Sequence, residues 1–197
     1  MPDPITFRPA TDNDCAQLVL YADMASRGLT SHLWGLQAAP GQSALEVGRD
    51  AVRHADEQFV HYRHWLIASQ ADTDLGGLLC YEVKPSSSAN TEPLPPSLAP
   101  LARLKEATVG CWHVSVAAVL SEARGQGIGG AMLARAEADA RARALPHLTL
   151  TVGSFNTGAL ALYQRVGFRE WAREAFVPFA GSDTAGDWIL MGKDTSG

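Results

Sequence analysis

Long apolar segments, a basic charge excess and a dense set of cysteines are all missing from this sequence of 197 residues. No apolar run approaches the roughly 18 residues that a membrane-spanning helix needs. The N-terminal MPDPITFRPA has neither the basic start nor the apolar stretch of a signal peptide. The formal net charge of −5 gives no general attraction to nucleic acid or to an anionic membrane. These absences predict a cytoplasmic protein that binds neither nucleic acid nor membranes.

The cysteines are three in number and widely spaced: Cys15, Cys80 and Cys111. An odd, scattered set is typical of free, buried thiols in a reducing compartment rather than of a disulfide framework. None of them stands in a pattern with histidine and an acid, so none is expected to be a nucleophile.

The histidine-rich stretch around residue 60 does not match a standard metal site. His54, His61 and His64 occur with Asp56 and Glu57, but their spacing is not that of a zinc motif. We therefore expect a solvent-exposed helix face and no bound metal.

Strand and helix patterns alternate along the chain. Strands are expected at residues 4–9, 64–70, 76–83, 110–120, 147–152, 168–177 and 187–193. Helices are expected from Thr11 or Asp12 to Gly28, and over residues 43–61, 128–145 and 157–166. Residues 28–42 are expected to form a loop, and residues 84–108 a Pro/Ser-rich insertion. The pattern predicts one α/β (α+β) domain over residues 1–197, with some parallel strand pairing.

The segment EARGQGIGGAML (residues 122–133) contains Gly125-x-Gly127-x-x-Gly130, which fits the dinucleotide-binding fingerprint. A Rossmann loop starts directly after its strand and has an acidic residue about 20 positions later. Here four residues separate the strand from the first glycine, and residues 147–156 contain no Asp or Glu. A P-loop is excluded because no Lys-Ser or Lys-Thr follows the glycines. The glycines and the helix after them still favour an anion, although a plain glycine-rich turn is the alternative.

Two motifs in the C-terminal half resemble those of the GNAT superfamily of N-acetyltransferases, which use acetyl-CoA. Arg124-Gly125-Gln126-Gly127-Ile128-Gly129 is similar to the family's [Arg/Gln]-x-x-Gly-x-[Gly/Ala] signature. A second set is similar to the family's N-x-x-A-x-x-x-Y-x-x-x-G-F ending: Asn156, Ala159, Leu160, Tyr163, Gly167 and Phe168. Ile5–Ala10 and Asp14 resemble its opening strand and first helix. The resemblance implies a single GNAT-type domain with a mixed, splayed sheet of about seven strands and helices on both faces.

The resemblance also implies where acetyl-CoA binds. The backbone amides of Gln126, Gly127, Ile128, Gly129 and Gly130 would hold the pyrophosphate, with Gly125 shaping the loop and Arg124 adding a positive charge at its rim. The backbone at Ala118 and Val119 would hold the thioester and stabilise the oxyanion. Asn156 would contact the pantetheine arm, and its position also suits a plain helix cap.

The implied reaction is transfer of an acetyl or short acyl group to the amine of a small molecule, peptide or protein. Tyr163 matches the family's general acid, which protonates the leaving thiolate, and a core aromatic is the alternative. His113, six residues before Val119, is the first candidate base, and a hydrogen-bonded strand histidine is the alternative. Glu82 is the second candidate base. Ordered water alone is a third possibility.

The acceptor pocket is expected outside these motifs. Candidate segments are residues 28–42 with Trp34, and residues 178–187 with Asp183 and Asp187. The insertion at 84–108 could cover this pocket, form an interface or be disordered. A homodimer stays open, and so does a different function, that of a non-catalytic module that binds acyl-CoA as a sensor or scaffold.

Overall fold

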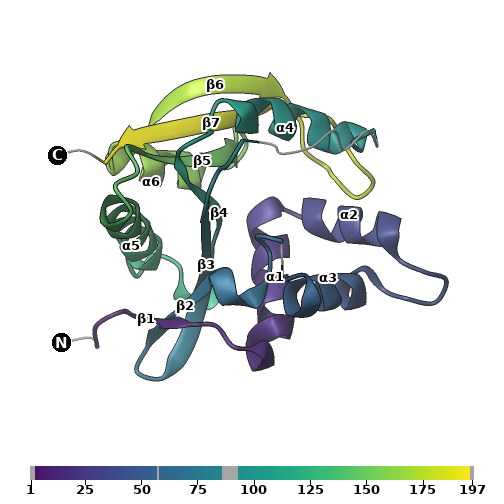
Figure 1. The fold of residues 1–197 in the computed structure, drawn as a ribbon, viewed down its shortest axis with the longest axis horizontal. Helices are drawn as coiled ribbons and strands as arrows, with labels where there is room; N and C mark the ends of the chain where they lie inside the picture. Colours follow the sequence, from purple (N-terminus) through teal and green to yellow (C-terminus); the bar gives the residue numbers. More distant parts are fainter. Residues whose placement is uncertain (1–2, 57, 86–92, 196–197) are drawn as a thin grey trace. The chain divides into compact units, whose positions relative to one another are not determined.

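The computed structural model describes residues 3–56, 58–85 and 93–195 of the chain (Figure 1). The described residues form seven strands: β1 (Thr6–Pro9), β2 (Trp65–Gln70), β3 (Thr73–Glu82), β4 (Trp112–Val119), β5 (His147–Gly153), β6 (Arg169–Ala175) and β7 (Asp187–Asp194). They also form six α-helices: α1 (Cys15–Ser26), α2 (Leu29–Gln37), α3 (Ala44–His54), α4 (Ala99–Glu106), α5 (Ile128–Ala142) and α6 (Thr157–Arg165).

The strands make one seven-stranded sheet in the order β1-β2-β3-β4-β5-β7-β6. β4 and β5 are parallel, whereas the pairs β1–β2, β2–β3, β5–β7 and β6–β7 are antiparallel. The expected fold class, a mixed α/β domain with about seven strands, is confirmed. The sheet was also expected to be splayed, and this stays a prediction.

Residue contacts group the chain into two compact units. The first unit contains Met1–Cys80, Val116–Leu133 and Ala180–Ser182, and the second contains Tyr81–Ser115, Ala134–Phe179 and Asp183–Gly197. The loop at 124–130 therefore belongs to the first unit, whereas Asn156 and Tyr163 belong to the second.

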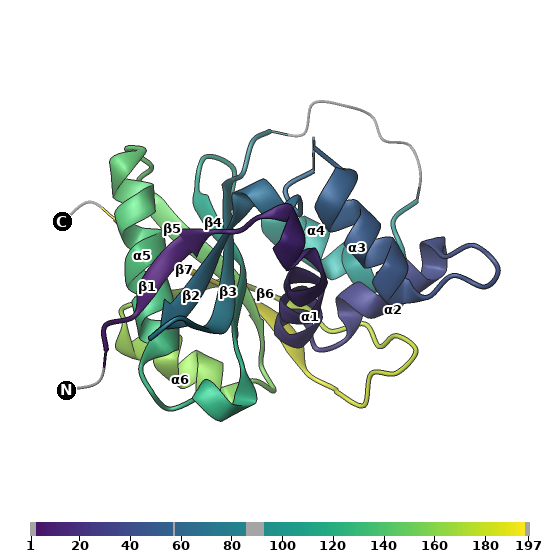
Figure 2. The ribbon, with the colours of Figure 1, turned by 90° about the horizontal axis from the view of Figure 1, so that it is seen from below.

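The first unit packs α1, α2 and α3 together (Figure 1), and its strands β1 and β2 lie side by side (Figure 2). α3 begins with a capping box, in which the Ser43 hydroxyl accepts from the Glu46 N–H and the Glu46 carboxylate accepts from the Ser43 N–H. Buried side chains form its core: Leu18, Tyr21, Trp34, Val52, Trp65, Ile67 and Leu79 among others. This burial is what holds short helices such as α2 and α3 in place.

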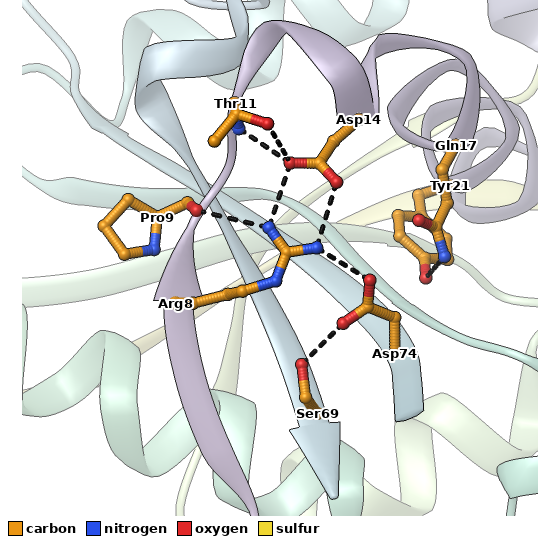
Figure 3. Close-up of polar contacts among 8 residues, drawn as sticks. All are labelled: Arg8, Pro9, Thr11, Asp14, Gln17, Tyr21, Ser69 and Asp74. Carbon is orange, nitrogen blue, oxygen red and sulfur yellow. Dashed lines mark hydrogen bonds and ion pairs between the residues drawn. The ribbon is translucent and has the colours of Figure 1, made fainter. Parts of the chain in front are cut away.

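A charged network joins β1, α1 and β3 of the first unit (Figure 3). The Arg8 guanidinium donates two hydrogen bonds of 2.9 Å to the Asp14 carboxylate and one of 2.7 Å to Asp74. Asp14 also accepts from the N–H of Thr11 at 2.7 Å, and Asp74 accepts from the Ser69 hydroxyl at 2.7 Å. The network fixes the entry of α1 relative to the strands.

The second unit contains β5, β7 and β6 side by side, with α4 in contact with β6 (Figure 1). Arg103 of α4 forms a 2.7 Å ion pair with Glu174 of β6. Buried apolar side chains of the strands make the centre of this unit: Val114, Leu148, Leu150, Val152, Ile189, Leu190 and Met191.

The expectation of a loop at residues 28–42 was wrong, and the insertion expected at 84–108 also contains a helix. Residues 29–37, expected in a loop, form α2, which Gly28 introduces in the left-handed conformation (φ 86°). The expected insertion at 84–108 contains α4, since Pro96 and Pro100 stand in the first turns of helical segments, where a missing N–H costs little. Residues 86–92 of that insertion lie outside the described residues.

The expected helix over residues 43–61 ends early, at His54, and His61 is not on an exposed face. The His61 side chain is buried, with Nε2 2.8 Å from the Asp56 carboxylate and 3.1 Å from the Arg53 carbonyl oxygen. Glu57 lies outside the described residues. Over the described ranges no cluster of three or more His, Cys, Asp or Glu suited to a metal occurs, and no helix there is long and apolar enough to cross a membrane.

Candidate active site

The glycine-rich loop of the first unit connects β4 to α5. Gly125 and Gly127 both have left-handed backbones, with φ of 78° and 83°, and a Cβ at either position would meet no atom within 4 Å. Backbone conformation therefore requires glycine here, and the space beside the loop is open. Ile128 starts α5, whose first-turn N–H groups have no carbonyl partner within the helix. An open loop leading into a helix N-terminus fits the diphosphate of a coenzyme.

Two side chains brace this loop from within the first unit. Arg124 is exposed and its Nε donates to the Val119 carbonyl oxygen at 3.3 Å. The Gln126 amide donates to the Glu122 carbonyl oxygen at 3.2 Å. The Arg124 contact links the loop to the last residue of β4 and leaves a positive charge at its rim.

The end of β4 approaches its neighbouring strand very closely. A Cβ on Gly76 of β3 would collide with the carbonyl oxygen of Ala118, and the Leu120 N–H donates to the Leu75 carbonyl oxygen at 2.9 Å. The backbone at Ala118 is therefore packed tightly against β3, and no larger residue than glycine fits at position 76.

Asn156 stands at the start of α6 in the second unit, as expected. The Leu160 N–H donates to its carbonyl oxygen at 3.0 Å, but among the described residues its side chain makes no capping hydrogen bond. The side-chain amide of Asn156 therefore does not cap α6.

Tyr163 lies about two turns into the same helix. Its ring is half-buried and lies 5.9 Å, between centroids, from the ring of Phe168. Burial raises the pKa of the Tyr163 hydroxyl to about 12. The phenol is consequently protonated throughout the physiological range and retains a proton to donate.

His113 is buried in β4 of the second unit, and its Nδ1 lies 3.0 Å from the Thr149 hydroxyl of β5. Its ring centroid is 5.8 Å from that of Tyr81, and the ammonium of Lys105 lies 5.0 Å from the Tyr81 ring centroid. Burial and then the Lys105 charge lower the pKa of His113 to about 4. The imidazole is therefore neutral at physiological pH.

Glu82, the second candidate base, is exposed at the end of β3. Successive side chains of a strand point to opposite faces, so Glu82 faces away from the side on which Tyr81 meets His113.

No sequence signal marks the residues around His113, which are Thr149, Tyr81 and Lys105. They come from three separate elements, β5, β3 and α4.

The residues expected to line an acceptor pocket differ in how far they are exposed and in whether they already have a partner. Trp34 is buried and packs directly on Gly48, where a Cβ would collide with its ring. Asp187 is already in an ion pair with Arg173, at 2.9 Å. Asp183 is exposed.

Comparison with known proteins assigns the family. The acetyltransferase (GNAT) family matches residues 42–168, which is more than half of the chain. The chain belongs to the GNAT acetyltransferase family. Members of this family use acetyl-CoA as the acyl donor, and the matched region includes the loop at 124–130 and β4.

Solved structures with the same fold span almost the whole of this GNAT chain. An N-acetyltransferase from Staphylococcus aureus Mu50 is 18% identical, with 98% of this chain and 99% of that chain covered and a TM-score of 0.62. A ribosomal-protein-alanine N-acetyltransferase from Brucella melitensis is 23% identical, with 96% and 99% covered and a TM-score of 0.61. The yncA protein of Salmonella typhimurium, solved with its cofactor acetyl-CoA, is 16% identical, with 98% and 94% covered and a TM-score of 0.61. Among curated proteins, none matches in sequence.

Proposed function

We propose that this protein transfers an acetyl or short acyl group from acetyl-CoA to an amine. The observation that carries the proposal is the loop at 124–130, where two left-handed glycines lead directly into α5 beside an exposed arginine. In a chain of the GNAT family, a loop of this geometry supports binding of the diphosphate of coenzyme A.

Each half of the cofactor has matching residues. Amides of Gln126 to Gly130 and the charge of Arg124 would bind the diphosphate. The backbone at Ala118, which is packed closely against β3, and at Val119 would orient the thioester and donate to the oxygen that gains negative charge. The Asn156 amide, which makes no capping hydrogen bond within the described ranges, would hold the pantetheine arm. When bound, acetyl-CoA supplies an electrophilic thioester carbon and a thiolate leaving group.

Two protons must move during the reaction. Tyr163 would donate its hydroxyl proton to the departing sulfur, since a phenol that stays neutral is always in the donating form. The amine must lose a proton, and His113, Glu82 and water are the candidate acceptors. With a pKa of about 4, His113 holds a proton weakly. This favours a role in which the imidazole accepts a hydrogen bond from the N–H of the amine, while the proton of the amine passes to water.

A panel of amines tests the proposal through the release of free CoA thiol, with calorimetric binding of acetyl-CoA measured separately. The panel includes small amines and peptides with free N-termini. An enzyme releases CoA with at least one acceptor above the rate of hydrolysis. Tight binding of acetyl-CoA without turnover across the panel would instead support the sensor function, and absence of binding would refute both.

A further inference from the structure

Four aromatic side chains of the second unit form a cluster that the reaction does not account for. Phe155 follows β5, Phe176 and Phe179 follow β6, and Trp188 lies in β7. The ring centroids are 5.6 Å apart for Phe155–Phe176, 5.9 Å for Phe155–Trp188, 5.4 Å for Phe176–Trp188 and 5.9 Å for Phe176–Phe179. The three phenylalanines are only half-buried. Large apolar rings that stay partly open to solvent offer a surface to a ligand.

The indole N–H of Trp188 adds a buried hydrogen-bond donor to this apolar cluster. Trp188 is 7% exposed, and its N–H has no hydrogen-bond partner among the residues that the structure describes. Buried donors of this kind are nearly always satisfied in folded proteins. A ligand that carries an acceptor atom next to an apolar body would meet both needs of the cluster.

Strand register puts the cluster on the face of the sheet that carries His113. Trp188 of β7 is opposite Gly153 of β5, and the Phe155 ring folds back over Gly153, where a Cβ would collide with it. Thr149 lies four residues before Gly153 and is opposite His113 of β4. Paired residues share a face and side chains alternate along a strand, so Trp188, Thr149 and His113 share one face. Four residues of a strand span about 13 Å.

Two further observations within the second unit relate this cluster to Asn156 and to α4. Phe155 directly precedes Asn156, the residue proposed to hold the pantetheine arm. Glu174, which is opposite Trp188 in the β6–β7 pair, binds Arg103 of α4. The helix inserted at 99–106 therefore lies over the same face as the cluster and His113.

We propose that Phe155, Phe176, Phe179 and Trp188 bind the body of the acceptor, and that the acceptor is an amine attached to an aromatic or other planar apolar group. This inference rests on the proposed acetyl transfer. An aromatic cage for the cationic amine itself is a poorer fit, because the rings pack edge to face, with interplanar angles of 84° for Phe155–Phe176 and 66° for Phe155–Trp188. Such packing adds a further ring readily.

Paired acceptors test the inference with the full-length protein. 2-Phenylethylamine is compared with n-hexylamine, tyramine adds a phenol oxygen for the Trp188 N–H, and tetrapeptides beginning with Phe or Leu form a second pair. We expect kcat/KM for the aromatic member of each pair to be at least tenfold higher. Phe176→Leu, or Phe179→Leu should that variant not fold, should raise KM for the aromatic acceptors about three- to tenfold. KM for acetyl-CoA should not change.

Trp188→Phe keeps a ring and removes the N–H. It should raise KM for tyramine more than for 2-phenylethylamine. Trp171→Phe is the matched control, because Trp171 lies on β6 outside the cluster and is 41% exposed. It should leave every constant unchanged. Thermal unfolding of each variant checks that the fold is retained.

The outcomes separate this inference from the proposed function. Turnover with equal kcat/KM for the aromatic and aliphatic members of a pair overturns the aromatic acceptor and leaves acetyl transfer standing. An aromatic preference that survives both Phe176→Leu and Trp188→Phe also overturns it, since the preference would then arise elsewhere. Absence of turnover with every amine and peptide overturns the proposed function itself.

Discussion

Replacing Asp14 by asparagine should destabilise the protein in a way that depends on pH. The Arg8 guanidinium, followed by the hydrogen bonds from Thr11, holds the pKa of Asp14 at about 2, against 3.8 in the unfolded chain. At about 1.4 kcal/mol per pKa unit this difference corresponds to about 2.4 kcal/mol. Arg8 is 41% exposed, so solvent screening reduces the value, and we expect a loss of about 1–1.5 kcal/mol at pH 7.

The direction of the pH dependence follows from the lowered pKa. The stabilisation is complete above about pH 5, where Asp14 is ionised in both states, and it is lost as the pH falls through the unfolded pKa of 3.8 towards the folded pKa of about 2. The wild type and the Asp14→Asn variant should therefore converge in stability at the acid end of this range. The amide oxygen of the substituted side chain can still accept the Thr11 N–H, so the variant removes the charge and keeps the cap.

Urea unfolding followed by circular dichroism at pH 7, 5, 4 and 3 measures the difference, and Asp50→Asn on the exposed face of α3 is the control. A carboxyl-carbon NMR titration reports the pKa of Asp14 directly. A loss that is as large at pH 3 as at pH 7 would mean that shape and packing, not the ion pair with Arg8, account for the effect. A normal NMR pKa would refute the reasoning outright.

Three further predictions concern the candidate site. Tyr163→Phe should lower kcat about a hundredfold and leave the calorimetric Kd for acetyl-CoA unchanged; unchanged kcat would remove Tyr163 from the acid role. Gly127→Ala should lower the free energy of unfolding in urea by about 1–2 kcal/mol and weaken acetyl-CoA binding, because the φ of Gly127 is 83°. Gly158→Ala in α6 is the control: no atom lies within 4 Å of its new Cβ, so it should not destabilise the protein. The pKa of His113 is about 4 in the folded protein and 6.5 in the unfolded chain. The free energy of unfolding of the wild type should therefore fall by up to about 3 kcal/mol between pH 6.5 and 4, and that of His113→Gln should not show this fall. Parallel pH curves for the two proteins would contradict a buried, neutral His113.

Features of the site that depend on local sequence were predictable. The left-handed glycines at 125 and 127, the helix start at Ile128 and the position of Asn156 before α6 all follow from residue types within one turn of chain. The positions of the strands were also predictable, because short runs of apolar and β-branched residues mark them, although β3 and β7 are buried over five consecutive residues and do not alternate. Local backbone preferences and short motifs carry this information without any knowledge of tertiary contacts.

Features that depend on tertiary contacts were not predictable. α2 is a nine-residue helix held by burial of Leu29 and Trp34, and a helix this short is not stable by propensity alone. The environment of His113 is a similar case, since Tyr81, Lys105 and Thr149 reach it from β3, α4 and β5. No local periodicity links residues that lie so far apart in the sequence.

The insertion that contains α4 shows both the local sequence pattern and the tertiary contacts that the pattern does not reveal. Its prolines suggested an irregular loop, yet two of its side chains act on the face that carries His113. Arg103 binds Glu174, opposite Trp188 in the strand pair. Lys105 lies over Tyr81 and, after burial, is the second cause of the lowered pKa of His113. In the proposed reaction, this helix would act on proton removal through the charge of Lys105 and on acceptor choice through its contact with the strand beside the aromatic cluster. Differences in acceptor among proteins with the same acetyl-CoA motifs are therefore expected to arise in segments such as this one.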